Sequence, residues 1–200
     1  MRTIIPRTGI LLMWIGIAVI GAIVYGIVND QITATISPEF FSVFKRHQFA
    51  QVLEQIGLMD APTRVQAIII GALATWWYGL FLGIVLGISS MIGRYAPLST
   101  RRYVYAAGWV LIATFGASVL FGAVAYFIEP LIKPDAGHWP FLAGIQHVRS
   151  AFAVGWWHNG AYLGALVATV MAGYRVQKQR RHGEDHSDVS GTGASQPRGV

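Results

Sequence analysis

The run TGILLMWIGIAVIGAIVYGIV, from Thr8 to Val28, contains no charged side chain. A helix needs about 20 apolar residues to cross the hydrocarbon core of a bilayer, so this run is long enough to span a membrane. It is also longer than the apolar region of a cleavable signal peptide, and no clear cleavage site follows it, which predicts an anchor that is retained. The same criterion selects three further runs: Val65 to Ile92, Tyr103 to Ile128 and Ser150 to Tyr174.

Composition supports a membrane protein, because 54% of the 200 residues are hydrophobic and only 12% are charged. Short connections between the runs leave no room for a separate soluble domain. We therefore predict an all-α fold, a polytopic four-transmembrane-helix bundle over residues 1–176. Residues 177–200 are rich in Gly, Ser, Arg and His without apolar periodicity, which predicts a disordered cytoplasmic tail.

The distribution of positive charge predicts the orientation. With the N-terminus inside, ten of the 15 Lys and Arg residues fall on the inner side, which agrees with the excess of positive charge in cytoplasmic loops. Both termini are then cytoplasmic in a cell (inner) membrane, and residues 29–64 form an outer loop. The net charge of +6 follows from this topology, and nucleic acid binding is not needed to explain it.

The outer loop contains two local patterns. Over residues 32–36 apolar residues alternate with Thr, which has the period of an extended segment. Ser37 and Pro38 then resemble the cap and first position of a helix that reaches Gly57. Its apolar side would carry Phe41, Phe44, Gln48, Val52 and Ile56, so we predict a short amphipathic helix on the outer membrane surface.

Small residues at four-residue spacing predict close packing between helices. The predicted packing faces are Ala18, Ala22 and Gly26 in the first run, Gly79, Gly83 and Gly87 in the second, and Gly160 and Gly164 in the fourth. Trp76 and Trp77 lie too deep in the second run for an interfacial belt, so we expect them to pack inside the bundle.

His158 is the most informative polar residue within an apolar run. It lies about 13 Å below the outer surface if Arg149 marks that surface, and ionisable groups at such depth usually mark a functional position. We expect the first outer loop to fold over the bundle so that His158 faces Asp30 and Glu39. The further candidates for a ligand or metal site are His47 and Asn159, with Gln31, Tyr162 and Glu129 in support.

Two functional classes fit these residues. In the first, the polar groups bind one another and fix the loop, and the protein is an accessory or assembly component with a membrane-protein partner or a second copy. In the second, they form an outward-facing site for a divalent metal or small ligand in a transporter-like protein or membrane enzyme. The sequence has no compact metal-ligand motif, phosphate-binding loop or haem-attachment motif and no Cys. Whether it is an enzyme is left open.

The chain also resembles a family of small bacterial four-span membrane proteins of uncharacterised function. The resemblance rests on three motifs: Asp30, Gln31 and Thr33 with Ser37 to Phe41, then Ala74 to Trp77, and finally His158, Asn159 and Tyr162 to Gly164. It covers the four runs and the first outer loop, without the tail. It implies that the Asp-Gln segment and the His-Asn pair act together, and it supplies no activity.

The predicted topology is testable with reporters that work only in the cytoplasm. A reporter fused after Val200 should be active, and the same reporter inserted near Gln55 should be inactive, because the positive charge places residue 55 outside. The opposite pattern of reporter activity would show that the predicted orientation is wrong.

Overall fold

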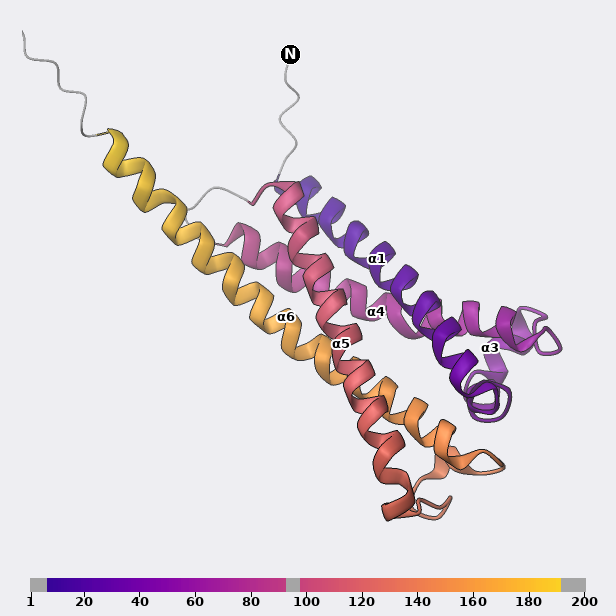
Figure 1. Ribbon diagram of the computed structural model, residues 1–200. Helices are drawn as coiled ribbons and strands as arrows, with labels where there is room; N and C mark the ends of the chain where they lie inside the picture. The colour runs from indigo at the N-terminus through magenta and orange to yellow at the C-terminus, as the bar shows by residue number, and fades with distance from the viewer. Residues whose placement is uncertain (1–6, 93–97, 192–200) are drawn as a thin grey trace, which may run out of the picture.

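The computed structural model describes residues 7–92 and 98–191, with side chains through Arg181. All regular secondary structure of the described residues is helical, and four long helices dominate it (Figure 1). They are α1 (Arg7–Ile36), α4 (Thr63–Met91), α5 (Thr100–Ile132) and α6 (Val148–Gly191). Arg2, Arg94 and Arg198, which contribute to the predicted topology, lie outside the described residues.

Three of these helices, α1, α4 and α5, are long and apolar enough to cross a membrane. Large apolar side chains are exposed along all of them, including Leu12, Ile84 and Ile112. Such surfaces suit lipid better than water, because a soluble monomer rarely exposes large contiguous apolar patches. Helix α6 contains the fourth predicted span but is less apolar, and within the described residues only the other three meet the criterion. The four-span arrangement therefore stays a prediction.

The helices form two tightly packed pairs, α1 with α4 and α5 with α6 (Figure 1). The predicted small-residue faces lie in these contacts. A Cβ atom added to Gly79 would lie 2.6 Å from Val19 Cα, and one added to Gly160 would lie 2.6 Å from Phe121 Cβ. Backbones approach this closely only where side chains are absent.

A few polar and aromatic contacts join the two pairs. Trp14 on α1 stacks on Tyr103 of α5 with ring centres 4.8 Å apart, and the Tyr103 hydroxyl donates to the Trp14 carbonyl at 3.0 Å. Tyr78 on α4 bonds the Thr169 hydroxyl of α6 at 2.7 Å. The bundle is thus held by small-residue packing within each pair and by buried hydroxyl groups between the pairs.

Helix α1 continues eight residues beyond the predicted end at Val28, so the extended segment predicted over residues 32–36 is wrong. Thr33 donates to the Asn29 carbonyl at 3.0 Å, and Thr35 donates to the Gln31 carbonyl at 2.9 Å. These bonds let threonine take part in a helix. The helix ends at Ile36, just before Ser37 and Pro38. A proline ring disfavours helical backbone at the residue before it, which accounts for this end.

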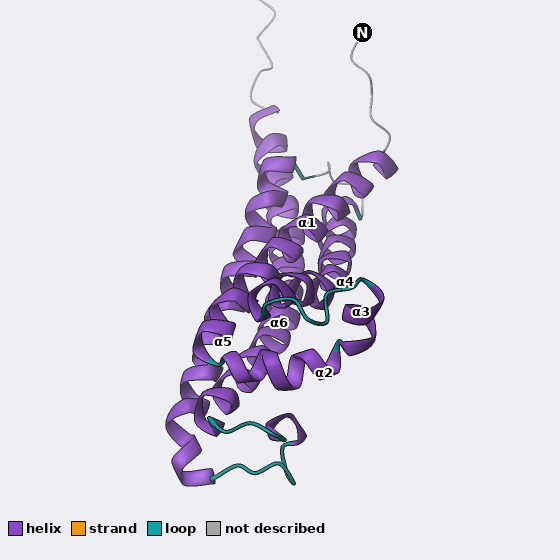
Figure 2. Ribbon diagram, turned by 90° about the vertical axis from the view of Figure 1, so that its right-hand side faces the viewer, coloured by secondary structure: helices purple, strands orange, loops and turns teal. Residues whose placement is uncertain are grey.

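The α1–α4 connection, residues 37–62, is built from three short helical pieces (Figure 2). They are a π-helix, η1 (Phe40–Lys45), followed by α2 (Arg46–Gln48) and α3 (Ala50–Gln55). The predicted short amphipathic helix is not confirmed, because the helical pieces are interrupted at Phe49. The predicted apolar face differs in part from the buried one. Ile56 is half-exposed, whereas the buried positions are Phe40, Phe41, Lys45 and Leu53.

Two further predictions differ from the structure. Trp76 and Trp77 are 47% and 48% exposed, because α4 packs through its glycine face and turns these rings outward. Helix α6 includes residues 177–191, for which disorder was predicted. Buried Arg180 donates to the carbonyls of Ser89 and Ile92 at 3.0 Å each, which ties this part of α6 to the end of α4. Residues 192–200 of the predicted tail lie outside the described residues.

Replacing Gly79 with Ala should test the close α1–α4 contact. The added methyl group meets backbone atoms, so we expect the free energy of unfolding to fall by about 1 to 3 kcal/mol, measured by denaturation in detergent micelles. Gly116→Ala is the matched control, because nothing lies within 4 Å of its added Cβ, and it should be neutral or slightly stabilising. Equal effects of the two substitutions would contradict close packing at Gly79.

Candidate functional site

The structure brings together Asp30 of α1 and His158 of α6. His158 Nε2 lies 3.3 Å from Asp30 Oδ1, and the two side chains are 12% and 5% exposed. Both groups are therefore largely removed from solvent. Two ionisable groups buried in an apolar bundle are costly unless they compensate each other.

The hydrogen bonds indicate where the protons of this pair lie. His158 Nδ1 is 2.8 Å from the Val154 carbonyl oxygen, which can only accept, so Nδ1 carries a hydrogen. Nε2 faces a carboxylate oxygen, and such a contact needs one further proton, either on the imidazole or on Asp30. Whichever residue carries that proton, the contact joins α1 to α6 through one hydrogen bond.

Asn29 and Trp157 extend the contact between α1 and α6. Trp157 Nε1 donates to Asn29 Oδ1 at 2.8 Å, and Asn29 Nδ2 donates to Asp30 Oδ1 at 3.3 Å. Two consecutive residues of α6 are thereby bonded to two consecutive residues of α1. The bond between Trp157 and Asn29 was not predicted, although the sequence contains the adjacent pairs Asn29-Asp30 and Trp157-His158.

Lys45 is a third buried ionisable group, and its role was not predicted. Its ammonium lies 6.0 Å from the centre of the Phe40 ring and 5.6 Å from that of Phe49. Burial lowers the pKa of Lys45, and the nearby charge of Asp30 acts in the opposite direction. Hydrogen bonds to the fifth residue along define a π-helix, so η1 places Lys45 one turn after Phe40 on its buried side. We call Asn29, Asp30, Lys45, Trp157 and His158 the polar cluster.

Aromatic rings from the α1–α4 connection cover the Asp30–His158 pair. The Phe40 ring stacks against the His158 ring at 5.3 Å, and Phe41 approaches it at 6.3 Å. Both Phe side chains are buried. This cover keeps water from the pair and strengthens its electrostatic interaction.

One oxygen of the Asp30 carboxylate, Oδ2, is buried and accepts no hydrogen bond within the described residues. A buried acceptor without a donor is costly. Lys45 offsets part of this cost through its charge. The Asp30 carboxylate is therefore compensated by two groups, the hydrogen bond to His158 and the charge of Lys45.

Glu39 was expected to face His158. It binds the start of α6 instead. Its Oε2 accepts from the backbone N–H groups of Gln146 and His147 at 3.0 and 2.8 Å, and its Oε1 lies 3.0 Å from His147 Nδ1. The hydrogen bond from the His147 N–H is the main cause that lowers the pKa of Glu39. A carboxylate at the N-terminal end of a helix is stabilised by the unpaired N–H groups there.

Gln31 also has a structural role. Its side-chain amide donates to the Arg64 carbonyl at 2.9 Å, and Arg64 donates to the Gln31 carbonyl at 2.6 Å and to the Thr35 hydroxyl at 3.0 Å. These bonds close the α1–α4 connection where it returns to the bundle.

Among the described residues, the remaining predicted site residues form no ion pair with the polar cluster. His47 and Asn159 are exposed, and Tyr162 is half-exposed and stacks on Trp77 at 6.4 Å. Glu129 is on α5, and no ion pair of its side chain is found among the described residues. Within the part of the chain that the structure describes, no three His, Asp or Glu side chains are grouped to hold a metal ion.

Comparison with protein-family models, curated proteins and solved structures finds no match for this chain. The site must therefore be interpreted from its own geometry, and the resemblance to the four-span family stays a prediction.

The Asp30–His158 contact predicts energetic coupling. In the set Asp30→Asn, His158→Ala and the double variant, the losses of stability should be non-additive, by about 0.5 to 3 kcal/mol for groups in contact. Asp30→Asn combined with Asn159→Ala is the control, since Asn159 is exposed, and should be additive. Additivity in both sets would contradict a direct contact between Asp30 and His158.

Glu39 predicts an acid-sensitive contact. Since its folded pKa lies below the ordinary value of 4.5, the stabilisation is present above pH 4.5 and is lost as the pH falls through the folded pKa. Limited proteolysis of the α1–α4 connection should therefore accelerate below pH 4.5. Glu39→Gln should cleave faster at neutral pH and lose most of this pH dependence, whereas Glu54→Gln should behave as the unmodified chain.

Proposed function

We propose that the protein is an accessory or assembly component of a cell (inner) membrane, built on four spans with both termini in the cytoplasm. In this proposal α6 supplies the fourth span and the α1–α4 connection faces the outside. The polar cluster and the Glu39 contact hold this connection on the bundle. Their role is to fix the shape of the outer face that a partner meets.

The observation that carries the proposal is that the polar cluster is covered. Asp30 and Lys45 are buried, and the rings of Phe40 and Phe41 lie against His158. Partners within the chain use the polar atoms of Asn29, Trp157 and His158. Such an arrangement stabilises a conformation, whereas a site that exchanges ligands needs polar groups that face an opening.

The outward-facing aromatic side chains of α4 support an accessory role. Trp76 and Trp77 lie at the middle of α4 and are half-exposed, and Trp77 stacks on half-exposed Tyr162. Interfacial tryptophans are expected near the ends of a span, so rings at its centre favour contact with another membrane helix. The partner would be a membrane protein or a second copy of this chain.

A ligand site is the second candidate, because Asp30 Oδ2 is buried without a donor among the described residues. A cation at this oxygen would belong to the transporter or enzyme class. Elemental analysis of the purified protein separates the two candidates: a stoichiometric metal that is lost in His158→Ala would favour the ligand site over the accessory role.

Site-directed cross-linking tests the accessory role directly. The chain has no Cys, so Trp76→Cys introduces a unique attachment point for a thiol-reactive photocross-linker in native membranes. We expect one adduct of defined mass from this position. Ile112→Cys is the control, at a 73% exposed position on α5, and should give none. Equal labelling at both positions would contradict a specific partner face on α4.

A further inference from the structure

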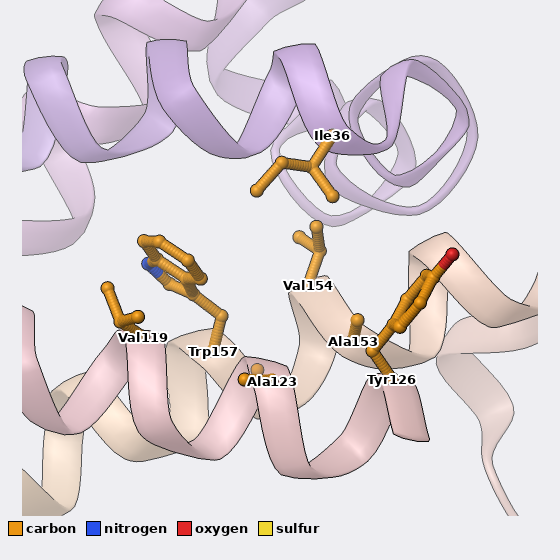
Figure 3. Close-up of a pocket in the computed structure, with 8 residues that line it drawn as sticks. Ile36, Val119, Ala123, Tyr126, Ala153, Val154 and Trp157 are labelled. Atoms are coloured by element: carbon orange, nitrogen blue, oxygen red, sulfur yellow. The ribbon is translucent and has the colours of Figure 1, made fainter. Parts of the chain in front are cut away.

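A small apolar cavity opens between the end of α1 and the α5–α6 pair. Its volume is about 190 Å³, and its walls are apolar side chains with one tyrosine. Figure 3 shows Ile36 on one side, with Val119, Ala123 and Tyr126 of α5 and Trp157 of α6 on the other. The cavity is half-open, because Ile36, Val119 and Tyr126 are each about two-fifths exposed.

Tyr126 lies at one end of this cavity, and Val119 and Trp157 lie at the other (Figure 3). A cation that is not part of the cavity lining packs against Tyr126. The guanidinium carbon of Arg149 lies 4.0 Å from the centre of the Tyr126 ring, and Arg149 Nε donates to the Tyr126 carbonyl at 3.0 Å. Arg149 is exposed and, within the described residues, forms no ion pair.

We propose that this cavity and Arg149 form a binding site for one phospholipid with a net negative headgroup. The lipid phosphate would bind the guanidinium at the Tyr126 end, and one acyl chain would lie along the cavity toward Val119 and Trp157. The proposal rests on the membrane location proposed above and not on the accessory role.

Shape and charge both favour a lipid over the alternatives. A helix is about 10 to 12 Å wide with its side chains, so a volume of about 190 Å³ cannot hold even one turn of it, whereas part of a hydrocarbon chain fits this volume. The apolar walls offer an acyl chain contact without unpaired polar groups. Arg149 retains N–H groups for a phosphate after donating Nε to Tyr126, and arginine binds phosphate through several donors at once.

The headgroup preference follows from the unbalanced charge of Arg149. A zwitterionic phosphatidylcholine brings its own cation, whereas phosphatidylglycerol carries an uncompensated negative charge. One basic residue near a membrane surface favours anionic lipid by about fivefold in affinity. The site should therefore select phosphatidylglycerol by roughly that factor.

Native mass spectrometry of the full chain in detergent, titrated with either lipid, tests the proposal. We expect one tightly bound phosphatidylglycerol, with about fivefold weaker binding of phosphatidylcholine. Arg149→Gln should weaken phosphatidylglycerol binding by about fivefold and remove the preference. Lys133→Gln removes one exposed cation near the same end of α5 and should leave binding unchanged.

A second pair of variants tests the cavity itself. Ala123→Trp fills the cavity and should abolish the tight site, whereas Val124→Trp adds the same ring to a neighbouring exposed position outside the cavity lining and should not. Equal losses from Arg149→Gln and Lys133→Gln would show only general attraction to positive charge and overturn the proposal. Unchanged lipid binding in Ala123→Trp would also overturn the proposal. Dimers of the unmodified chain that disappear in Ala123→Trp would overturn it too, because the occupant of the cavity would then be a second copy of the chain. Cross-linking at Trp76 does not depend on these outcomes, so failure of the lipid site and failure of the accessory role are distinguishable.

Discussion

A carboxylate buried on α1 is the constraint on which the arrangement of this bundle depends. Asp30 is 3% exposed, and an isolated charge in such a place would be strongly destabilising. Three groups stabilise this carboxylate. His158 of α6 and Asn29 of α1 form hydrogen bonds with it, and Lys45 of the α1–α4 connection contributes its charge. The fold of the connection is thus linked to the position of α6.

Trp157 links this polar cluster to the apolar cavity. Its indole N–H donates to Asn29, while its ring forms part of the cavity wall (Figure 3). The cavity and the Asp30–His158 pair therefore lie on two sides of one residue of α6. Any displacement of this ring would change a hydrogen bond next to Asp30, because interiors packed at high density transmit small movements.

Features of the fold that depend on hydrophobicity and residue size along one helix were predictable from the sequence. Helices α1, α4 and α5 contain the predicted runs, and the glycines at four-residue spacing lie in the helix contacts. The meeting of Asp30 with His158 was expected from their depth and polarity. Other patterns gave wrong predictions for two different reasons. The alternation over residues 32–36 is typical of an extended segment, but Thr33 and Thr35 form local hydrogen bonds within the helix. The outward orientation of Trp76 and Trp77 depends instead on tertiary packing, because α4 contacts α1 through its glycines.

The contacts of the Lys and Arg side chains were the least predictable feature. A count of positive charges along the sequence does not reveal what each side chain contacts. Of the five Lys and Arg residues assigned to the outer side, Lys45 is buried near Asp30, Arg64 binds Gln31 and Thr35, and Arg149 lies on Tyr126. Because Lys45 is buried, its charge is not presented to the membrane surface in the way that an exposed arginine presents its charge. A count of charge weighs the two residues equally, so the contacts that decide the effect of each cation cannot be read from the sequence.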